Sequence, residues 1–425
     1  MTIAKVICSA WTGVLLFSLA ADNLNAQNTF TWEQIKDRFE ASNPTLKAAK
    51  DNIDESRAEE ITAYLRPNPD FSLSADGFQI SSNQGVWRPL SGVFETPSIS
   101  YLHERQHKRE LRLASAQQST AVTVAQYADQ ERSLLFNLRN SFVQTLQAKA
   151  VLQNAKGNLD YWDGELKVNR NRFKAGDLAE VDLDRLELQR VQFESDYETA
   201  LVNLRTAKIQ LLQLLNDRTP IEQFDLTGPF EFNAELKPLE EFRNEALAVR
   251  PDLKAAVQSV ELAKTNYRLA IANGSTDPTF GVWFTHNASI ANPFANNTMG
   301  ASISIPLRIF DRNQGEKART RIDMERNERL RDATQAQVFS DVDSAYVTLT
   351  SAIDLLRPYK EKYLPLAGVV RSKVSFAYQH GGASLLDYLD AEKSYRDTRL
   401  AYLNLVGSYL VAAGQMNMAV GREVL

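Results

Sequence analysis

Hydrophobic residues recur at alternating spacings of three and four over two long parts of the chain. The first part has two arms around a turn at Gly176, and its repeated positions are Leu152, Ala155, Leu159, Trp162 and Leu166, then Phe193, Tyr197, Ala200, Leu204, Ala207 and Leu211. The second part shows the spacing at Tyr346, Leu349, Ile353 and Leu356. Heptads predict antiparallel coiled-coil hairpins, about 100 Å long where no proline interrupts them. Pro358 and Pro365 are expected to kink the second hairpin.

Four shorter segments alternate apolar residues with small or polar ones. Phe280 and Val282, for example, alternate with Thr279 and Gly281. This alternation predicts strands with two different faces. The strands are expected at about 69–78, 92–101, 278–286 and 299–307. An apolar face opposite a polar face suits a transmembrane β-barrel with lipid outside and water inside, although a soluble sheet would show the same alternation.

The two halves of the chain repeat each other. "NPTLKAA" at 43–49 returns as "RPDLKAA" at 250–256, and "NPDFSL" at 68–73 returns as "DPTFGV" at 277–282, a shift of 277 − 68 = 209. Pro97 matches Pro306 at the same shift. The chain therefore divides into a first structural repeat, a linker and a second repeat, at 27–216, 217–238 and 239–425. The long hairpins are expected at about 102–216 and 311–421.

The first 26 residues have the layout of a secretory signal peptide, with Lys5 before an apolar run and a cleavage site after Ala26. The only cysteine, Cys8, lies in this segment, so no disulfide is expected in the mature chain. No later apolar run reaches the roughly 18 to 20 residues of a spanning helix, so membrane insertion would require β-strands. The net charge of −5 without a basic block predicts no nucleic-acid partner.

One short motif suggests an enzyme. His103, Glu104 and His107 form H-E-x-x-H, the zinc signature of metallopeptidases. On a helix the two imidazoles could share a zinc ion, with Glu104 as the general base. However, this segment lies where a strand gives way to a long helix, and the matching residues of the second repeat, 312–316, contain no histidine. We therefore interpret the motif as a charged helix start and expect no metal, no cofactor and no catalytic activity.

The tandem repeat, the segments "LRPNPDFSLSADG" and "SISIPLRIFDRNQGEKARTR", and two turn signatures resemble the TolC-type outer-membrane efflux proteins. The signatures are Phe173-x-x-Gly176-x5-Asp182 and Tyr378-x-x-Gly381-x5-Asp387. "IPLRIFDRNQG" at 305–315 is similar to the heavy-metal (cobalt-zinc-cadmium) branch of that family. The resemblance covers essentially the whole mature chain.

This resemblance implies a mainly α-helical fold with a transmembrane β part. In a homotrimer, four strands from each chain would close one shared β-barrel in outer-membrane lipid, and the hairpins would form an α-barrel extending into the periplasm of a Gram-negative-type cell. Closure is physically necessary, because a four-stranded sheet in lipid would leave open edges. The implied function is a passive export conduit, for heavy-metal cations or drugs, joined to an inner-membrane pump by a periplasmic adaptor.

The resemblance also implies two sets of site residues. Asp387 and Asp390 lie one helical turn apart and match positions that face the periplasmic opening in the family, where a trimer would stack them as rings of negative charge. Asp182 matches Asp387 in the first repeat, but Arg185 replaces the second acid. The alternative is an exposed helix start, where acids favour the helix dipole. The tip turns where the adaptor would dock contain Phe173, Gly176, Tyr378 and Gly381.

Three functions remain open from the sequence. A trimeric conduit accounts for the signal peptide, the repeat, the strands and the heptads together. A secreted or surface coiled-coil protein, such as an adhesin, accounts for the helices only. A zinc metallopeptidase accounts for the five residues of the histidine motif only.

Overall fold

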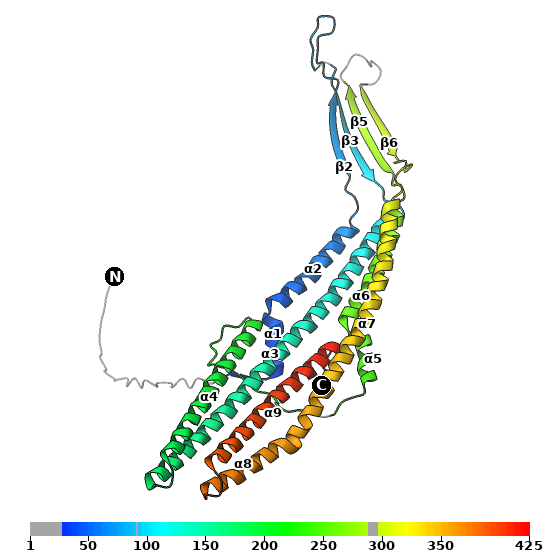
Figure 1. Cartoon of the computed structure of the whole chain (residues 1–425). Coiled ribbons are helices and arrows are strands. Elements are labelled where there is room, and N and C mark those ends of the chain that lie inside the picture. The colour runs from blue at the N-terminus through cyan, green and yellow to red at the C-terminus, as the bar shows by residue number, and fades with distance from the viewer. Residues whose placement is uncertain (1–27, 91, 234, 288–295) are drawn as a thin grey trace, which may run out of the picture.

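The computed structural model describes residues 28–90, 92–233, 235–287 and 296–425. The expected signal peptide, with Cys8 and the cleavage site after Ala26, lies outside these residues. The chain is elongated. A small β-sheet lies at one end, long helices extend away from it, and the turns of two helical hairpins form the far end (Figure 1). None of the described helices is long and apolar enough to cross a membrane.

The sheet has four antiparallel strands in the order β2-β3-β5-β6. They are β2 (Asp70–Asp76), β3 (Phe94–Leu102), β5 (Thr279–Asn287) and β6 (Asn297–Ser304). One face carries apolar side chains that are more than half exposed, among them Phe71, Leu73, Ile99, Val282 and Ile303. The other face carries mainly small and polar side chains, although Trp283 lies on it opposite Ser98. The hydroxyls of Ser72 and Ser98 hydrogen bond across this face at 2.7 Å. Strands β2 and β6 each pair on one side only, so the described sheet has two open edges.

The structure corrects the repeat alignment at the second strand of each pair. Phe71 pairs with Ile99, and its counterpart Phe280 pairs with Ile303, so the shift here is 303 − 99 = 204 rather than 209. Pro97 therefore does not correspond to Pro306. The strand expected to reach 307 ends at Ser304, and Pro306, which has no N–H to donate to a neighbouring strand, lies beyond it.

Helices make up the rest of the molecule. Their bounds are α1 (Trp32–Ser42), α2 (Pro44–Tyr64), α3 (Lys108–Ala175), α4 (Glu180–Leu214), α5 (Leu239–Val249), α6 (Pro251–Asn273), α7 (Gln314–Pro358), α8 (Leu364–Gln379) and α9 (Leu385–Val420). Proline begins α2 and α6. The Asn43 side chain caps α2 by accepting a 3.0 Å hydrogen bond from the Leu46 N–H. Arg250 holds the same place before α6 and makes no side-chain cap.

The long helices form two hairpins. In the first, α3 runs unbroken for 68 residues and α4 packs beside it. In the second, α7 continues through a π-helical turn (Tyr359–Tyr363) into α8, and α9 returns beside them. The π-turn lies between Pro358 and Pro365, where the sequence predicts a kink, because each proline removes a backbone donor from the helix. The heptad residues Trp162, Leu166 and Phe193 are buried between the arms, which confirms the coiled-coil prediction.

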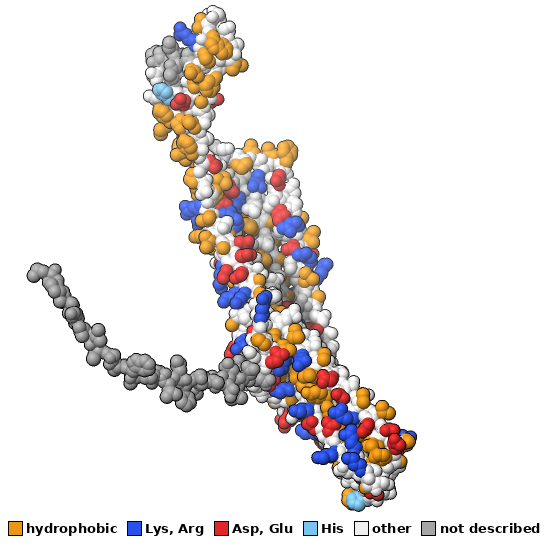
Figure 2. All heavy atoms as spheres, turned by 90° about the vertical axis from the view of Figure 1, so that its left-hand side faces the viewer, with side chains coloured by type: hydrophobic (Ala, Val, Ile, Leu, Met, Phe, Trp, Pro, Cys, Tyr) orange, Lys and Arg blue, Asp and Glu red, His pale blue; other side chains and the backbone are white. Residues whose placement is uncertain are grey.

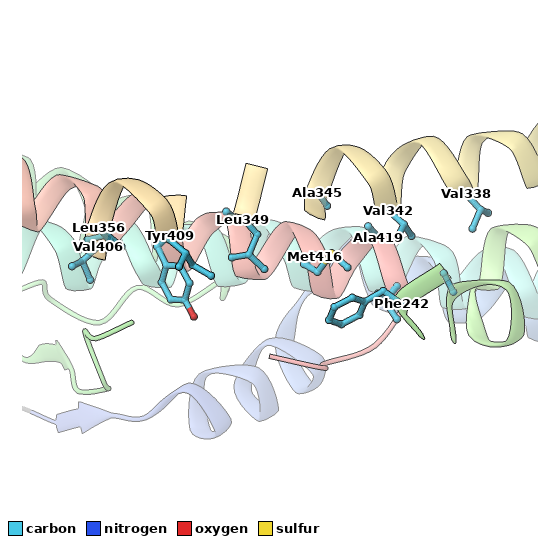
Figure 3. Packing of buried hydrophobic residues seen from close by; sticks show 14 residues of the cluster. Phe242, Val338, Val342, Ala345, Leu349, Leu356, Val406, Tyr409, Met416 and Ala419 are labelled. Carbon is cyan, nitrogen blue, oxygen red and sulfur yellow. The ribbon is translucent and has the colours of Figure 1, made fainter. Parts of the chain in front are cut away.

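Each repeat has its own apolar core at mid-height of the molecule. In the second repeat, α5, α7 and α9 bury Phe242, Val342, Leu349, Val406 and Met416 (Figure 3). The first repeat has an equivalent core, formed by α1, α3, α4 and the short strand β4 (Phe224–Leu226). Strand β4 lies in the predicted linker and pairs in parallel with β1 (Asn28–Phe30). The surface shown in Figure 2 is apolar over much of the strand end and rich in acidic and basic side chains over the helices.

Candidate functional site

The candidate site is the end of the molecule farthest from the sheet, where the α3–α4 and α8–α9 turns lie near each other (Figure 1). Both turns reverse through a left-handed glycine, Gly176 with φ 83° and Gly381 with φ 76°. The turns close with hydrogen bonds from the Asp177 N–H to the Arg172 carbonyl and from the Gly382 N–H to the Ala377 carbonyl. A Cβ at Gly176 or Gly381 would meet no atom within 4 Å, so the backbone of both turns is open to an approaching partner.

The two aromatic residues of the turn signatures take different positions. Phe173 is 39% exposed, whereas Tyr378 is only 6% exposed. The Tyr378 ring stacks on Tyr388 with centroids 4.8 Å apart, and its hydroxyl hydrogen bonds to Asn169 Oδ1 at 3.3 Å. Tyr378 therefore joins the hairpins together and offers no exposed ring to a partner, whereas Phe173, Gly176 and Gly381 are exposed at the two turns. Docking of an adaptor at these turns stays a prediction.

An aromatic cluster holds the two hairpins against each other just above the turns. Trp162 of α3 is completely buried, lies 5.0 Å from the Phe193 ring of α4, and stacks on Tyr388 of α9 at 6.0 Å. Its indole N–H donates to the Leu186 carbonyl at 3.1 Å, so the polar atom of this buried ring is satisfied. Because the cluster takes side chains from both repeats, it fixes the relative position of the tips.

A buried ion pair lies farther from the turns than Tyr388 of the aromatic cluster. Arg371 of α8 donates to Glu392 of α9 at 2.8 Å, and the Glu392 side chain is 6% exposed. The guanidinium also lies 4.0 Å from the ring centroid of Tyr161 on α3, so the pair is in contact with the first hairpin. Burial raises the pKa of Glu165, which lies on the same α3 segment, while the positive charge of Arg371 acts in the opposite direction. The hairpins thus meet through charged as well as aromatic groups.

The structure places the acidic site residues at helix starts, where Asp387 and Asp390 are exposed and Asp182 is half-buried. Asp387 accepts hydrogen bonds from the Ser384 N–H at 3.1 Å and hydroxyl at 2.7 Å, and these donors hold the pKa of Asp387 below its usual value. Asp390 is exposed one turn further along α9. Asp182, on the other hairpin, lies 3.7 Å from Arg185. The capping role of Asp387 follows the S-x-x-[DE] pattern at Ser384, a signal that the sequence analysis missed.

The histidine motif does not form a zinc site. Residues 103–107 lie in the connection before α3, and His107 has a left-handed backbone with φ 55°, so the two imidazoles do not share a helix face. Both oxygens of Glu104 accept hydrogen bonds from the Arg112 guanidinium. Among the residues that the structure describes, no group of three His, Cys, Asp or Glu side chains could hold a metal ion. The metallopeptidase hypothesis requires both histidines on one helix face, and this premise fails.

Comparison with protein families gives a match over the second repeat. Residues 242–422 match the family described as Outer membrane efflux protein. Curated relatives extend the similarity to the first repeat. The cobalt-zinc-cadmium resistance protein CzcC of Cupriavidus metallidurans is 23% identical over 90% of this chain and 87% of its own length. The outer membrane protein TolC of Escherichia coli is 21% identical over 91% of this chain and 81% of its own length.

Solved structures show the same fold. CusC, from a study of folding and transmembrane channel formation, superposes with a TM-score of 0.76 at 18% identity and covers 92% of both chains. The open state of the MtrE outer membrane channel of Neisseria gonorrhoeae superposes with a TM-score of 0.73 at 18% identity, covering 92% of this chain and 89% of its own.

Proposed function

We propose that this chain, which belongs to the outer membrane efflux protein family, is the outer-membrane conduit of a tripartite efflux system. Proteins of this family form homotrimers and work with a periplasmic adaptor and an inner-membrane pump. The conduit is passive, because the energy for export comes from the pump. Its strand end lies in outer-membrane lipid, and its helical hairpins extend into the periplasm.

The observation that carries this proposal is a sheet with an exposed apolar face and two open edges. Phe71 and Leu73 of β2 are 69% and 66% exposed on the face opposite the serines. Lipid cannot hydrogen bond to the free backbone groups of β2 and β6, so the sheet has to close with strands of other copies. Three copies close one shared barrel. A secreted coiled-coil protein would have no use for this face.

Heavy-metal cations are the substrate class that we favour. The relative CzcC is named for resistance to cobalt, zinc and cadmium, whereas the relative OpmQ of Pseudomonas putida is named for pyoverdine export. A strain that lacks this protein should become several-fold more sensitive to those metals, and expression of the protein should restore resistance. Restored resistance to organic drugs alone would assign the conduit to a different pump.

The oligomeric state gives a direct test of the conduit. Folded protein in detergent should have the mass of three chains in light scattering corrected for bound detergent, because four strands cannot enclose a lumen. Heat should convert this species to unfolded monomer. A stable, folded monomer under the same conditions would contradict the proposed barrel, whatever the export phenotype.

We propose further that Asp387 and Asp390 line the periplasmic opening as two rings of carboxylates. Asparagine at both positions keeps the Asp387 cap on α9 while removing about six charges from a trimer. In planar bilayers the double variant should show altered conductance and a reduced preference for cations over anions. Asp160→Asn with Asp163→Asn removes as many exposed carboxylates from the first hairpin and should leave selectivity unchanged. Wild-type selectivity in the Asp387 and Asp390 variant would mean that these residues only stabilise the helix start.

A further inference from the structure

The internal repeat supplies a template for a contact that one chain cannot complete. At the seam between the repeats, α3 packs on α6 and β3 pairs with β5. In the internal repeat, α7 and β6 correspond to α3 and β3, and α2 and β2 correspond to α6 and β5. The first pair lies on one outer flank of the chain and the second pair on the other. Strands β2 and β6 are the open edges of the sheet. A second copy placed beside the first would therefore repeat the seam between α7 and β6 of one copy and α2 and β2 of the next.

The equivalence between the repeats can be fixed residue by residue. Ile99 of β3 matches Ile303 of β6, and farther along Leu138 of α3 matches Val342 of α7, both with a shift of 204. On the other side, Phe39 of α1 matches Ala246 of α5, a shift of 207. These two matches agree, because Leu138 and Phe39 belong to the first core and Val342 and Ala246 to the second.

When the contacts at the seam are transferred to the outer flanks by these shifts, side chains of opposite charge face each other. At the seam, the Ser115 hydroxyl donates to Asn266 Oδ1 at 2.6 Å. The shifts convert these residues to 115 + 204 = 319 and 266 − 207 = 59, which are Arg319 and Glu59. One turn from Glu59 on the same face of α2 is Glu55, and two turns from Arg319 on the same face of α7 is Arg326.

The spacing between facing positions at the seam limits which further residues can pair. Residue numbers of facing pairs at the seam sum to 381 for Ser115 and Asn266 and to 384 for Arg132 and Asp252. The shifts change each sum by 204 − 207 = −3, so facing pairs of α7 and α2 should sum to between 378 and 381. Glu59 with Arg319 is the transferred Ser115–Asn266 pair itself, and Glu55 with Arg326, with a sum of 381, lies at the upper end of this range.

The monomer leaves these charges available. Glu55 and Glu59 are exposed, and neither makes a hydrogen bond or ion pair with any residue that the structure describes. Arg319 bonds to Glu316 and Arg326 to Asp323, both three residues away on the exposed surface of α7. Such local exposed pairs are weak, so they can be exchanged for partners on another chain.

We propose that α2 of one copy packs beside α7 of a second copy of this chain, with Glu59 facing Arg319 and Glu55 facing Arg326. The inference rests on the conduit proposed above and specifies its subunit interface. In this arrangement the charged flanks align the copies, and an ion pair takes the place of the neutral Ser115–Asn266 pair of the internal seam.

The same transfer fixes the strand register between copies. At the seam, Ile99 of β3 pairs with Val282 of β5. Their equivalents are Ile303 of β6 and Leu73 of β2, since 282 − 209 = 73 with the shift that relates Phe71 to Phe280. This register keeps the apolar residues of the two copies on the same face and sets Ser302 opposite Ser74 on the polar face. A slip by one residue would reverse the faces, so the register is strongly specified.

Cysteine cross-linking tests the register. In a Cys8→Ser background, Leu73→Cys combined with Ile303→Cys should give covalently linked trimers on oxidation in membranes, because directly opposed side chains lie close together. Leu73→Cys with Ser302→Cys is the matched control, since those side chains point to opposite faces, and it should remain unlinked. A wild-type trimer in which the first pair fails to cross-link would overturn this interface and leave the conduit intact. A wild-type monomer would overturn the conduit itself.

Charge exchange tests the helical pairs. Glu55→Arg with Glu59→Arg, and separately Arg319→Glu with Arg326→Glu, should each increase trimer dissociation in detergent at least about tenfold at low salt, because like charges face each other. The variant that carries all four changes should regain wild-type trimer content. Rescue distinguishes pairing from a folding defect, and a fourfold variant no better than either double variant would contradict the proposed pairs.

Discussion

Gly381→Trp is expected to abolish export while leaving the trimer and its membrane insertion intact. Gly381 lies at the tip of the second hairpin, far from the sheet and from both mid-height cores, so the change should not disturb either (Figure 1). The indole would cover backbone that is open in the present turn and block the helical hairpin of an adaptor. Export should be measured as metal resistance, with trimer content and membrane fractionation determined on the same cells.

Two further variants separate blocked docking from backbone strain. Gly381→Ala strains the left-handed turn, at a cost of about 1 to 2 kcal/mol, but adds almost no bulk. Gly382→Trp adds the bulk at a residue whose φ is not positive. The docking proposal predicts that Gly381→Ala retains export and that Gly382→Trp loses it. The reverse result would show that the turn conformation, rather than access to its surface, limits export.

Trp162→Ala is expected to loosen both hairpin tips without unfolding the rest of the chain. The residue is completely buried between Phe193 and Tyr388, and truncation of such a ring costs about 3 to 5 kcal/mol. Amide hydrogen exchange near the tips, in residues 160–195 and 376–395, should accelerate by up to roughly two to four orders of magnitude. Exchange around Val342 and Met416, in the core at mid-height, should stay unchanged.

Trp87→Ala is the matched control, because Trp87 is 55% exposed in the connection between β2 and β3. Its removal should leave exchange at the tips as in the wild type. If Trp162→Ala accelerates exchange in the first hairpin only, the aromatic cluster does not couple the two repeats, and contacts such as Arg371 with Tyr161 must hold the tips together.

The long periodic elements could be predicted because their signals are local. Heptads at Trp162 and Phe193 identify buried helix faces, and alternation at Phe280 and Val282 identifies a strand with one apolar face. Glycine at 176 and 381 marks the turns, since both positions have a left-handed backbone. These patterns also carried the family resemblance, which the comparisons confirm.

Other features depend on contacts that no local pattern contains. Tyr378 matches Phe173 in the turn signature but is buried, because Tyr388 and Asn169 come from other helices to meet it. The correspondence of Pro97 with Pro306 failed because only strand pairing reveals that the connection between β2 and β3 is longer than the connection between β5 and β6. The parallel pairing of β1 with β4 was missed because three-residue strands carry almost no periodicity.

This last pairing constrains the order in which the chain can fold. Asn28 pairs with Phe224, so β1 meets its partner across 224 − 28 = 196 residues. Closing a loop of this length costs about 5 kcal/mol of chain entropy, which three backbone pairs do not supply on their own. The first hairpin can form from local contacts and bring the two strands together, because Leu211 of α4 and Ile35 of α1 share one core. While this chain is itself being secreted, β1 therefore remains unpaired until the whole first repeat and part of the linker have crossed the inner membrane. A chain stopped before Phe224 would expose that strand permanently, however well its long helices had folded.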